Sequence, residues 1–255
     1  MNDSFSQFYD ALAADYDAMT GFDQRFAAEQ GFFASMVEKY KIKTALDAGC
    51  GAGAHALLLA RLGVAVTAVD ASEEMLRAAA HHADAMRLPV TLRRIDLFRD
   101  TDSILERFDA AFCMGNTIAH AGSVDEAQKA IGGLLALLRP GGILVVQLLN
   151  FERILKDCPR IINRKTVGDA TYVRYYSYDK DTIVFKILTM RRTGARVVRT
   201  LITTRLCPLR RKDLAEAFVS SGLTPLMYGG IDFSPFNAAH SKDILVICQL
   251  SSISF

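Results

Sequence analysis

The stretch Leu46-Asp47-Ala48-Gly49-Cys50-Gly51-Ala52-Gly53-Ala54 decides the fold. The apolar residues before it predict a short buried strand over 43–48, and the leucine-rich run after it predicts a helix over 54–62. Glycine has no Cβ and adopts positive φ, so a turn with three glycines lets the backbone approach a ligand closely. Free N–H groups at the start of the helix add a partial positive field. The stretch therefore predicts a ligand-binding loop, although a tight turn without a ligand would also fit it.

The second predicted strand, 64–69, ends at Asp70, about 20 residues past the glycines. A carboxylate at this position can accept two hydrogen bonds from a ribose diol, or it can serve as an acid at a helix N-terminus. The loop satisfies the relaxed dinucleotide fingerprint, Gly49-x-Gly51-x-x-Ala54. With Asp47 in front, it also resembles motif I of class I S-adenosylmethionine (SAM) methyltransferases. Both ligands carry adenosine, so Asp70 does not separate them.

Composition narrows the class of protein. The chain has 255 residues, 51% of them hydrophobic, which suits one α/β domain with a small insertion. A formal charge of +2 predicts no strong attraction to nucleic acid or to an anionic membrane. The cysteines are scattered without a CxxC pair, so we expect no metal site and no disulfide framework. Without a signal peptide or an apolar run long enough to cross a membrane, we expect a cytoplasmic protein.

The chain divides into four expected parts. Residues 1–42 form an N-terminal helical cap, and residues 43–155 form a Rossmann-like cofactor-binding core of alternating strands and helices. Residues 156–209 break this alternation with period-two strands and form an antiparallel β insertion that acts as a lid. Residues 210–255 complete the core with a helix and two strands. The expected fold is a doubly wound, mostly parallel, seven-stranded α/β sheet.

The most specific motif follows the fourth predicted strand, 108–113. It reads Gly115-Asn116-Thr117-x-x-His120 and resembles the loop of the glycine and sarcosine/dimethylglycine N-methyltransferase group. The helix, the "RPGG" run at 139–142 and the apolar strand 143–149 are common in SAM methyltransferases, and the run 150–155 is similar to that group. The resemblance implies that Asn116 and His120 are catalytic and contact the acceptor. His120 could relay a proton or merely tie the loop.

The resemblance also implies a set of cofactor contacts. The opening helix, with Tyr9 and Tyr16, resembles the helix that folds over SAM in many methyltransferases. Met75 is expected against the adenine, or as ordinary core, and Asp96 is expected at the adenine amine, or as a turn cap. The implied SAM contacts are Tyr16, Asp47, Ala48, Gly49, Cys50, Gly51, Gly53, Asp70, Ala71, Met75, Asp96, Leu97, Met114 and Gly115. S-adenosylhomocysteine (SAH) would be the product.

The acceptor is expected under the lid. In the strand 171–178 alternate side chains share a face, so Arg174, Tyr176 and Tyr178 are candidate acceptor contacts. There is one departure from the resembled group, in which an arginine precedes the Asn150 position to pair with a carboxylate. This chain has Leu149, and leucine cannot replace a bidentate clamp.

The expected function is methyl transfer from SAM to a small molecule, most simply an amine nitrogen. Three alternatives stay open: O- or C-methylation of another metabolite, an NAD-dependent oxidoreductase, and a non-catalytic SAM-binding protein. Neither nucleic acid nor membrane is expected as a partner. An edge strand or the hairpin of the lid could mediate a homodimer.

Overall fold

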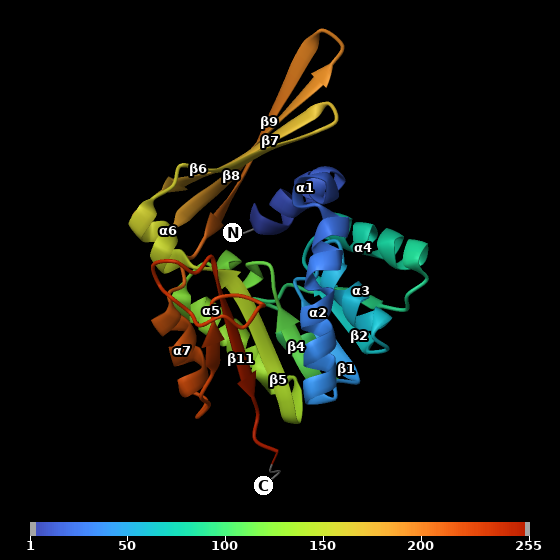
Figure 1. Ribbon diagram of the computed structural model, residues 1–255, viewed down its shortest axis with the longest axis vertical. Helices are drawn as coiled ribbons and strands as arrows, with labels where there is room; N and C mark the ends of the chain where they lie inside the picture. Colours follow the sequence, from blue (N-terminus) through green and yellow to red (C-terminus); the bar gives the residue numbers. More distant parts are fainter. Residues whose placement is uncertain (1–3, 253–255) are drawn as a thin grey trace.

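The computed structural model describes residues 4–252 and has a seven-stranded sheet at its centre (Figure 1). The strand order is β3-β2-β1-β4-β5-β11-β10. Only the pairs that involve β11 are antiparallel, which confirms the expected sheet. The strands are β1 (Thr44–Ala48), β2 (Ala65–Asp70), β3 (Thr91–Arg94), β4 (Phe108–Cys113), β5 (Leu138–Leu149), β10 (Leu226–Tyr228) and β11 (Asp243–Gln249).

Helices cover both faces of this sheet. The run Ile143–Val146 in β5 is apolar throughout because both of its faces are buried. Ile143 and Val145 belong to the core under α2, α3 and α4, whereas Leu144 and Val146 belong to the core under α5 and α7. The helices are α2 (Phe22–Tyr40), α3 (Ala54–Arg61), α4 (Glu73–Met86), α5 (Val124–Ala136) and α7 (Arg211–Val219).

The expected loop at 139–142 is wrong in detail. Strand β5 begins at Leu138, which pairs with Phe108, so the "RPGG" run lies within the strand. The register shifts between Phe108 and Ala110, and Gly141 has a φ of 78°. Residues 139–142 of β5 therefore stand opposite Asp109 alone and form a bulge between two paired stretches.

A second sheet of four antiparallel strands follows the core, in the order β6-β7-β8-β9. Strands β7 and β8 form a hairpin with its turn after Tyr178, and β9 pairs with β8, in agreement with the antiparallel insertion expected over 156–209. Sequence reasoning missed β6 and the short helix α6. Strand β6 has no buried residue, and its apolar and polar residues do not alternate. These elements are α6 (Phe151–Asp157), β6 (Ile161–Val167), β7 (Ala170–Tyr178), β8 (Ile183–Thr193) and β9 (Arg196–Leu206).

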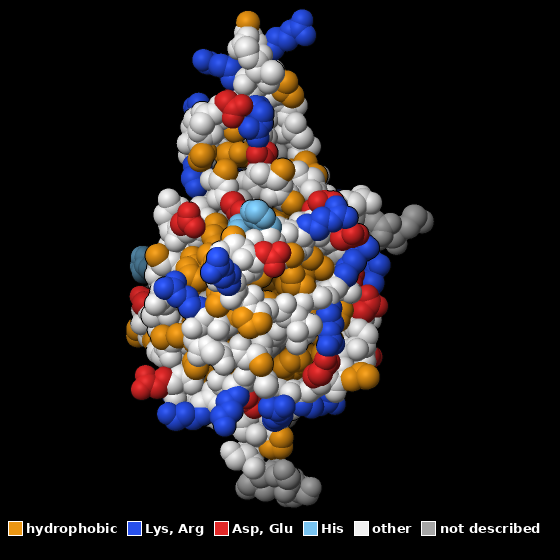
Figure 2. Space-filling model, turned by 90° about the vertical axis from the view of Figure 1, so that its right-hand side faces the viewer, with side chains coloured by type: hydrophobic (Ala, Val, Ile, Leu, Met, Phe, Trp, Pro, Cys, Tyr) orange, Lys and Arg blue, Asp and Glu red, His pale blue; other side chains and the backbone are white. Residues whose placement is uncertain are grey.

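The second sheet rises beyond the carboxyl ends of the core strands, and α1 (Ser4–Thr20) lies between the two (Figure 1). Phe8, Leu12 and Met19 of α1 pack with Tyr172 and Ile187 of this sheet. Its far end narrows to an arm with Lys and Arg side chains at the tip (Figure 2). The sheet therefore stands over the edge where ligands of open α/β sheets bind.

Helix α1 ends at Thr20, and Gly21, with a φ of 75°, separates it from α2 within the predicted helical cap. Among residues 4–252, no helix combines the length and the hydropathy needed to span a bilayer. The same residues contain no cluster of His, Cys, Asp and Glu that could hold a metal ion.

Candidate active site

The glycine loop connects β1 to α3. Gly49, Gly51 and Gly53 have φ values of 75°, 53° and 86°, a region that costs other residues about 1–2 kcal/mol. A Cβ on Gly49 would lie 2.3 Å from Cγ2 of Thr117. A Cβ on Gly51 would instead point toward the hydroxyl of Tyr16, 3.7 Å away. The loop thus brings its backbone close to the turn after β4 on one side and to α1 on the other.

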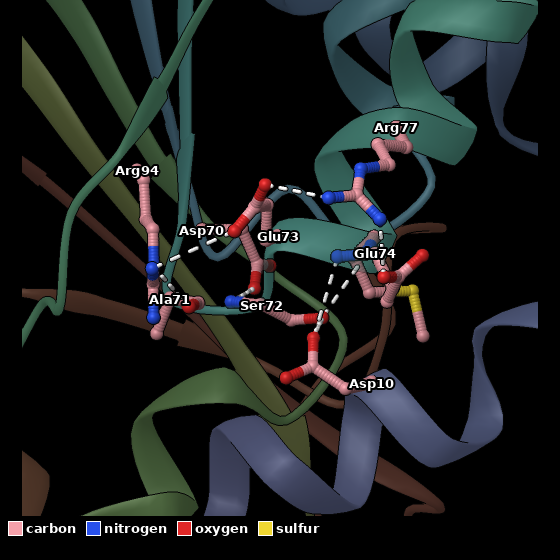
Figure 3. A network of polar contacts seen from close by, with 9 residues as sticks. Asp10, Asp70, Ala71, Ser72, Glu73, Glu74, Arg77 and Arg94 are labelled. Atoms are coloured by element: carbon pink, nitrogen blue, oxygen red, sulfur yellow. Dashed lines mark hydrogen bonds and ion pairs between the residues drawn. The ribbon is translucent and has the colours of Figure 1, made fainter.

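Asp70 ends β2 beside this loop. Its Oδ2 accepts a hydrogen bond from the Gly51 N–H at 2.8 Å, and its Oδ1 accepts one from the Ser72 N–H at 2.9 Å. Figure 3 shows the network around it, in which the Ser72 hydroxyl donates to Asp10 of α1 at 2.6 Å. Burial raises the pKa of Asp70 to about 6. Each carboxylate oxygen keeps a second acceptor position, so the two oxygens can still accept hydrogen bonds from a diol.

A small cavity of about 50 Å³ lies over the loop and Asp70. Nine of the residues that the sequence implied for the cofactor line it: Tyr16, Gly49, Cys50, Gly51, Asp70, Ala71, Leu97, Met114 and Gly115. Helix α1 and the segments that follow the carboxyl ends of β1, β2, β3 and β4 bring these residues together, so the walls combine chain segments far apart in sequence.

Five of the implied cofactor residues do not line this cavity: Asp47, Ala48, Gly53, Met75 and Asp96. Met75 is fully buried beneath α1 with Phe8 and Leu12, which matches the alternative of ordinary core. Oδ1 of Asp96 accepts the Phe98 N–H at 2.9 Å, which matches the alternative of a turn cap. Asp47 is fully buried, its pKa is raised by that burial, and neither of its oxygens has a hydrogen-bond partner among the described residues.

A larger cavity of about 420 Å³ lies between the core and the second sheet. Asn116, His120, Arg174 and Tyr176 line it, as does Leu149. Tyr178 does not, and its hydroxyl donates to the Pro159 carbonyl at 2.9 Å. Residues that line both cavities form a neck between them, and these are Tyr9, Tyr16, Thr20, Arg25, His55, Met114, Gly115 and His120.

His120 lies in this neck. The Tyr9 hydroxyl is 2.9 Å from its Nε2, while its Nδ1 has no partner among the described residues. Burial lowers the pKa of His120 to about 4, so the imidazole is neutral at neutral pH. Asn116 has a φ of 73°, and its Oδ1 accepts the Leu149 N–H at 3.1 Å. Its amide N–H groups stay available to the larger cavity.

Sequence reasoning missed a charged cluster in the neck. Nε of Arg25 donates to Glu29 at 3.0 Å, and both side chains reach Nε2 of His55 at 2.7 Å. The hydrogen bond and charge of His55 lower the pKa of Glu29 although its burial acts in the opposite direction. The sequence contains only two signals for this cluster. They are the two charged residues four apart in α2 and the histidine among the apolar residues of α3.

The sequence pattern of the family described as "Methyltransferase domain" matches residues 45–142, from β1 into β5. The glycine loop, Asp70 and the neck all lie in this region or against it. Residues 45–142 thus match a methyltransferase domain, and the chain has the fold of class I SAM-dependent methyltransferases. This match favours SAM over the dinucleotide alternative, and the chain carries the sheet order and the glycine loop that its sequence predicted.

The chain also resembles individual proteins. It is 30% identical to a glycine/sarcosine N-methyltransferase of Aphanothece halophytica over 154 residues, which are 60% of this chain and 57% of the relative. A SAM-dependent methyltransferase of Clostridium acetobutylicum shares its fold with a TM-score of 0.81 at 17% identity, over 95% of this chain and 99% of that one. A SAM-bound amino pentose methyltransferase of Micromonospora echinaspora has a TM-score of 0.70 at 19% identity, over 92% of this chain and 96% of that one. The chain thus spans little more than half of its curated relative.

Proposed function

We propose that this methyltransferase transfers the methyl group of SAM to an amine nitrogen of a small molecule. The observation that carries the proposal is the neck, where a cavity over the glycine loop meets a larger cavity under the lid. Such a junction suits a reaction that joins two ligands in line. Relatives at about 30% identity are glycine and sarcosine N-methyltransferases, which supports nitrogen as the receiving atom.

The residues of the smaller cavity fit SAM. Asp70 has free acceptor positions for the ribose diol, and the Cβ-free face of Gly51 leaves room opposite Tyr16. Arg25, which lines both cavities, is a cation for the carboxylate of the methionine part. The enclosed volume of about 50 Å³ is far below the ~300–1,000 Å³ of ligand pockets, so α1 with Tyr9 and Tyr16 must move for SAM to enter.

SAM supplies an electrophilic methyl group on a sulfonium. The new C–N bond forms as the C–S bond breaks, SAH leaves, and one amine proton goes to solvent. The chain's task is alignment, which contributes up to about 7–11 kcal/mol in the best intramolecular reactions. The pKa of about 4 makes His120 a weaker base than free imidazole. His120 therefore orients a neutral amine by a hydrogen bond rather than holding its proton.

A screen of amines and amino acids with radiolabelled SAM tests the proposal. We expect label in at least one amine and an N-methyl product by mass spectrometry. His120→Ala should lower turnover while SAH binding, followed by its thermal shift, stays intact. Label in hydroxyl or carbon acceptors only would contradict nitrogen transfer, and unchanged turnover of His120→Ala would remove the role of His120.

A further inference from the structure

Arg174 of β7 is a cation without an acidic partner. Its Nε donates to Oδ1 of Asn163 at 2.7 Å, which is its only hydrogen bond to residues 4–252, and no carboxylate among them lies within ion-pair distance of it. Other arginines near the site are paired, Arg25 with Glu29 and Arg191 with Asp15. A guanidinium has five N–H donors, so four of those on Arg174 remain without a protein acceptor.

This guanidinium is partly withdrawn from water. Arg174 lines the larger cavity, where burial lowers its pKa, and the Tyr16 and Tyr176 phenols nearby have the opposite effect. Desolvating a charge costs free energy unless an opposite charge and hydrogen bonds compensate it. The chain supplies one amide oxygen here, so an anionic ligand would add the opposite charge that the described residues do not provide.

On the opposite wall, the cation that lines the cavity is the exposed Lys242, which adjoins Asp243. Leu149 of β5 lines this wall where the resembled glycine enzymes have an arginine. Asp243, in register with Leu149 on the adjacent strand, adds a carboxylate without an ion pair among the described residues. The charge of Lys242 acts on the neighbouring Asp243, so the cation left for an anionic group of the acceptor is Arg174 on the second sheet.

The position of Arg174 and the volume of the larger cavity indicate how long the acceptor is. Arg174 lines the larger cavity but is not part of the neck, where the receiving nitrogen must lie. The volume of about 420 Å³ falls within the ~300–1,000 Å³ of pockets for ligands much larger than glycine. Several bonds thus separate the nitrogen from the group that Arg174 binds.

We propose that the acceptor is an amine with a distal oxyanion, a carboxylate or a phosphoryl group, and that Arg174 binds this oxyanion from the lid. A guanidinium pairs with either group through two parallel hydrogen bonds. The inference rests on the proposed methyl transfer for its choice of an amine, while anion binding at Arg174 can be measured without any turnover.

The test is calorimetric titration of the SAH-loaded protein with three probes, 4-aminobutyrate, 3-aminopropylphosphonate and butylamine. At least one anionic probe should bind more tightly than butylamine, and the preferred one identifies the oxyanion. Arg174→Met should weaken that probe about 10- to 100-fold, as expected for charge-assisted hydrogen bonds, and leave butylamine within about threefold. Arg174→Lys should retain part of the affinity.

Arg164→Met is the matched control, because Arg164 is an exposed arginine on β6 of the same sheet and does not line the cavity. It should leave all three affinities unchanged, and unchanged SAH affinity of Arg174→Met shows that this variant is folded. Equal binding of the three probes, or equal loss of all three in Arg174→Met, would overturn the inference. Arg174-dependent binding without methyl transfer would instead contradict only the proposed function.

Discussion

The hydroxyl of Tyr9 lies 2.9 Å from Nε2 of His120 and joins helix α1 to the turn that follows β4. The two residues are 111 positions apart in the chain, and both line the neck between the cavities. Burial raises the pKa of Tyr9 and lowers that of His120, so both groups are neutral. The contact therefore fixes the imidazole of His120 against α1.

Tyr9→Phe should remove the link between α1 and the imidazole of His120. The ring remains, but His120 loses a hydrogen bond of about 0.5–1.5 kcal/mol, so we expect kcat to fall roughly 2- to 13-fold. SAH affinity should change less than kcat because the glycine loop and Asp70 are untouched. Steady-state kinetics together with SAH titration measure both effects. An unchanged kcat would show that the imidazole is held without Tyr9.

The pH dependence of turnover should come from the acceptor. His120, with a pKa of about 4, stays neutral between about pH 6 and 9, so kcat/KM should rise over this range only as the amine loses its proton. The profile of His120→Gln should have the same midpoint at a lower rate. A midpoint near the ordinary histidine value that disappears in this variant would restore a proton-relay role for His120.

SAH binding should weaken in acid. The pKa of Asp70 is raised to about 6 in the free protein, whereas hydrogen bonds from a ribose diol favour the ionised carboxylate. Below this pKa a proton has to leave before the diol binds, so Kd should rise toward tenfold per pH unit. Asp70→Asn should bind weakly at pH 8 and flatten the dependence. Titrations from pH 5 to 8 that give one constant Kd would argue against the diol contact.

Gly51→Ala should abolish tight SAH binding. The new methyl group would point toward Tyr16 across the small cavity, and the φ of 53° adds strain of about 1–2 kcal/mol. Gly63→Ala is the control, because it has a φ of 82° but no atom within 4 Å of the added Cβ. Both variants should lose stability in thermal unfolding, and only Gly51→Ala should lose SAH. Equal SAH affinity in the two would place the cofactor elsewhere.

Leu149→Arg should shift the choice of acceptor. Leu149 lines the larger cavity, so the variant places a guanidinium on its β5 wall, beside Asp243. We expect glycine methylation to rise at least tenfold relative to the parent, since a short amino acid could then be clamped near the neck. Label transfer to glycine measures this, with Leu149→Met as the control for altered packing. No gain in glycine methylation would mean that residue 149 does not select the acceptor.

The amino-acid sequence determined the parts of this protein that depend on neighbouring residues. Strand β1, the glycine loop and α3 follow from one stretch of hydrophobic pattern and glycines, and the Ser72 cap of α4 accepts the Met75 N–H as a local motif should. The hairpin of β7 and β8 likewise follows from period-two alternation across a polar turn. Local backbone preferences and the periodicity of burial suffice for such elements.

Tertiary structure alone decided which side chains share a cavity. Met75 and Asp96 stand in the expected elements, yet one is buried under α1 and the other caps a turn. The cluster of Arg25, Glu29 and His55 and the contact of Tyr9 with His120 join segments that the sequence keeps apart. The packing between elements decides which face of α1 meets the core and which face of the second sheet meets α1. The periodicity of one element shows which of its faces is buried, but it does not encode which element covers that face.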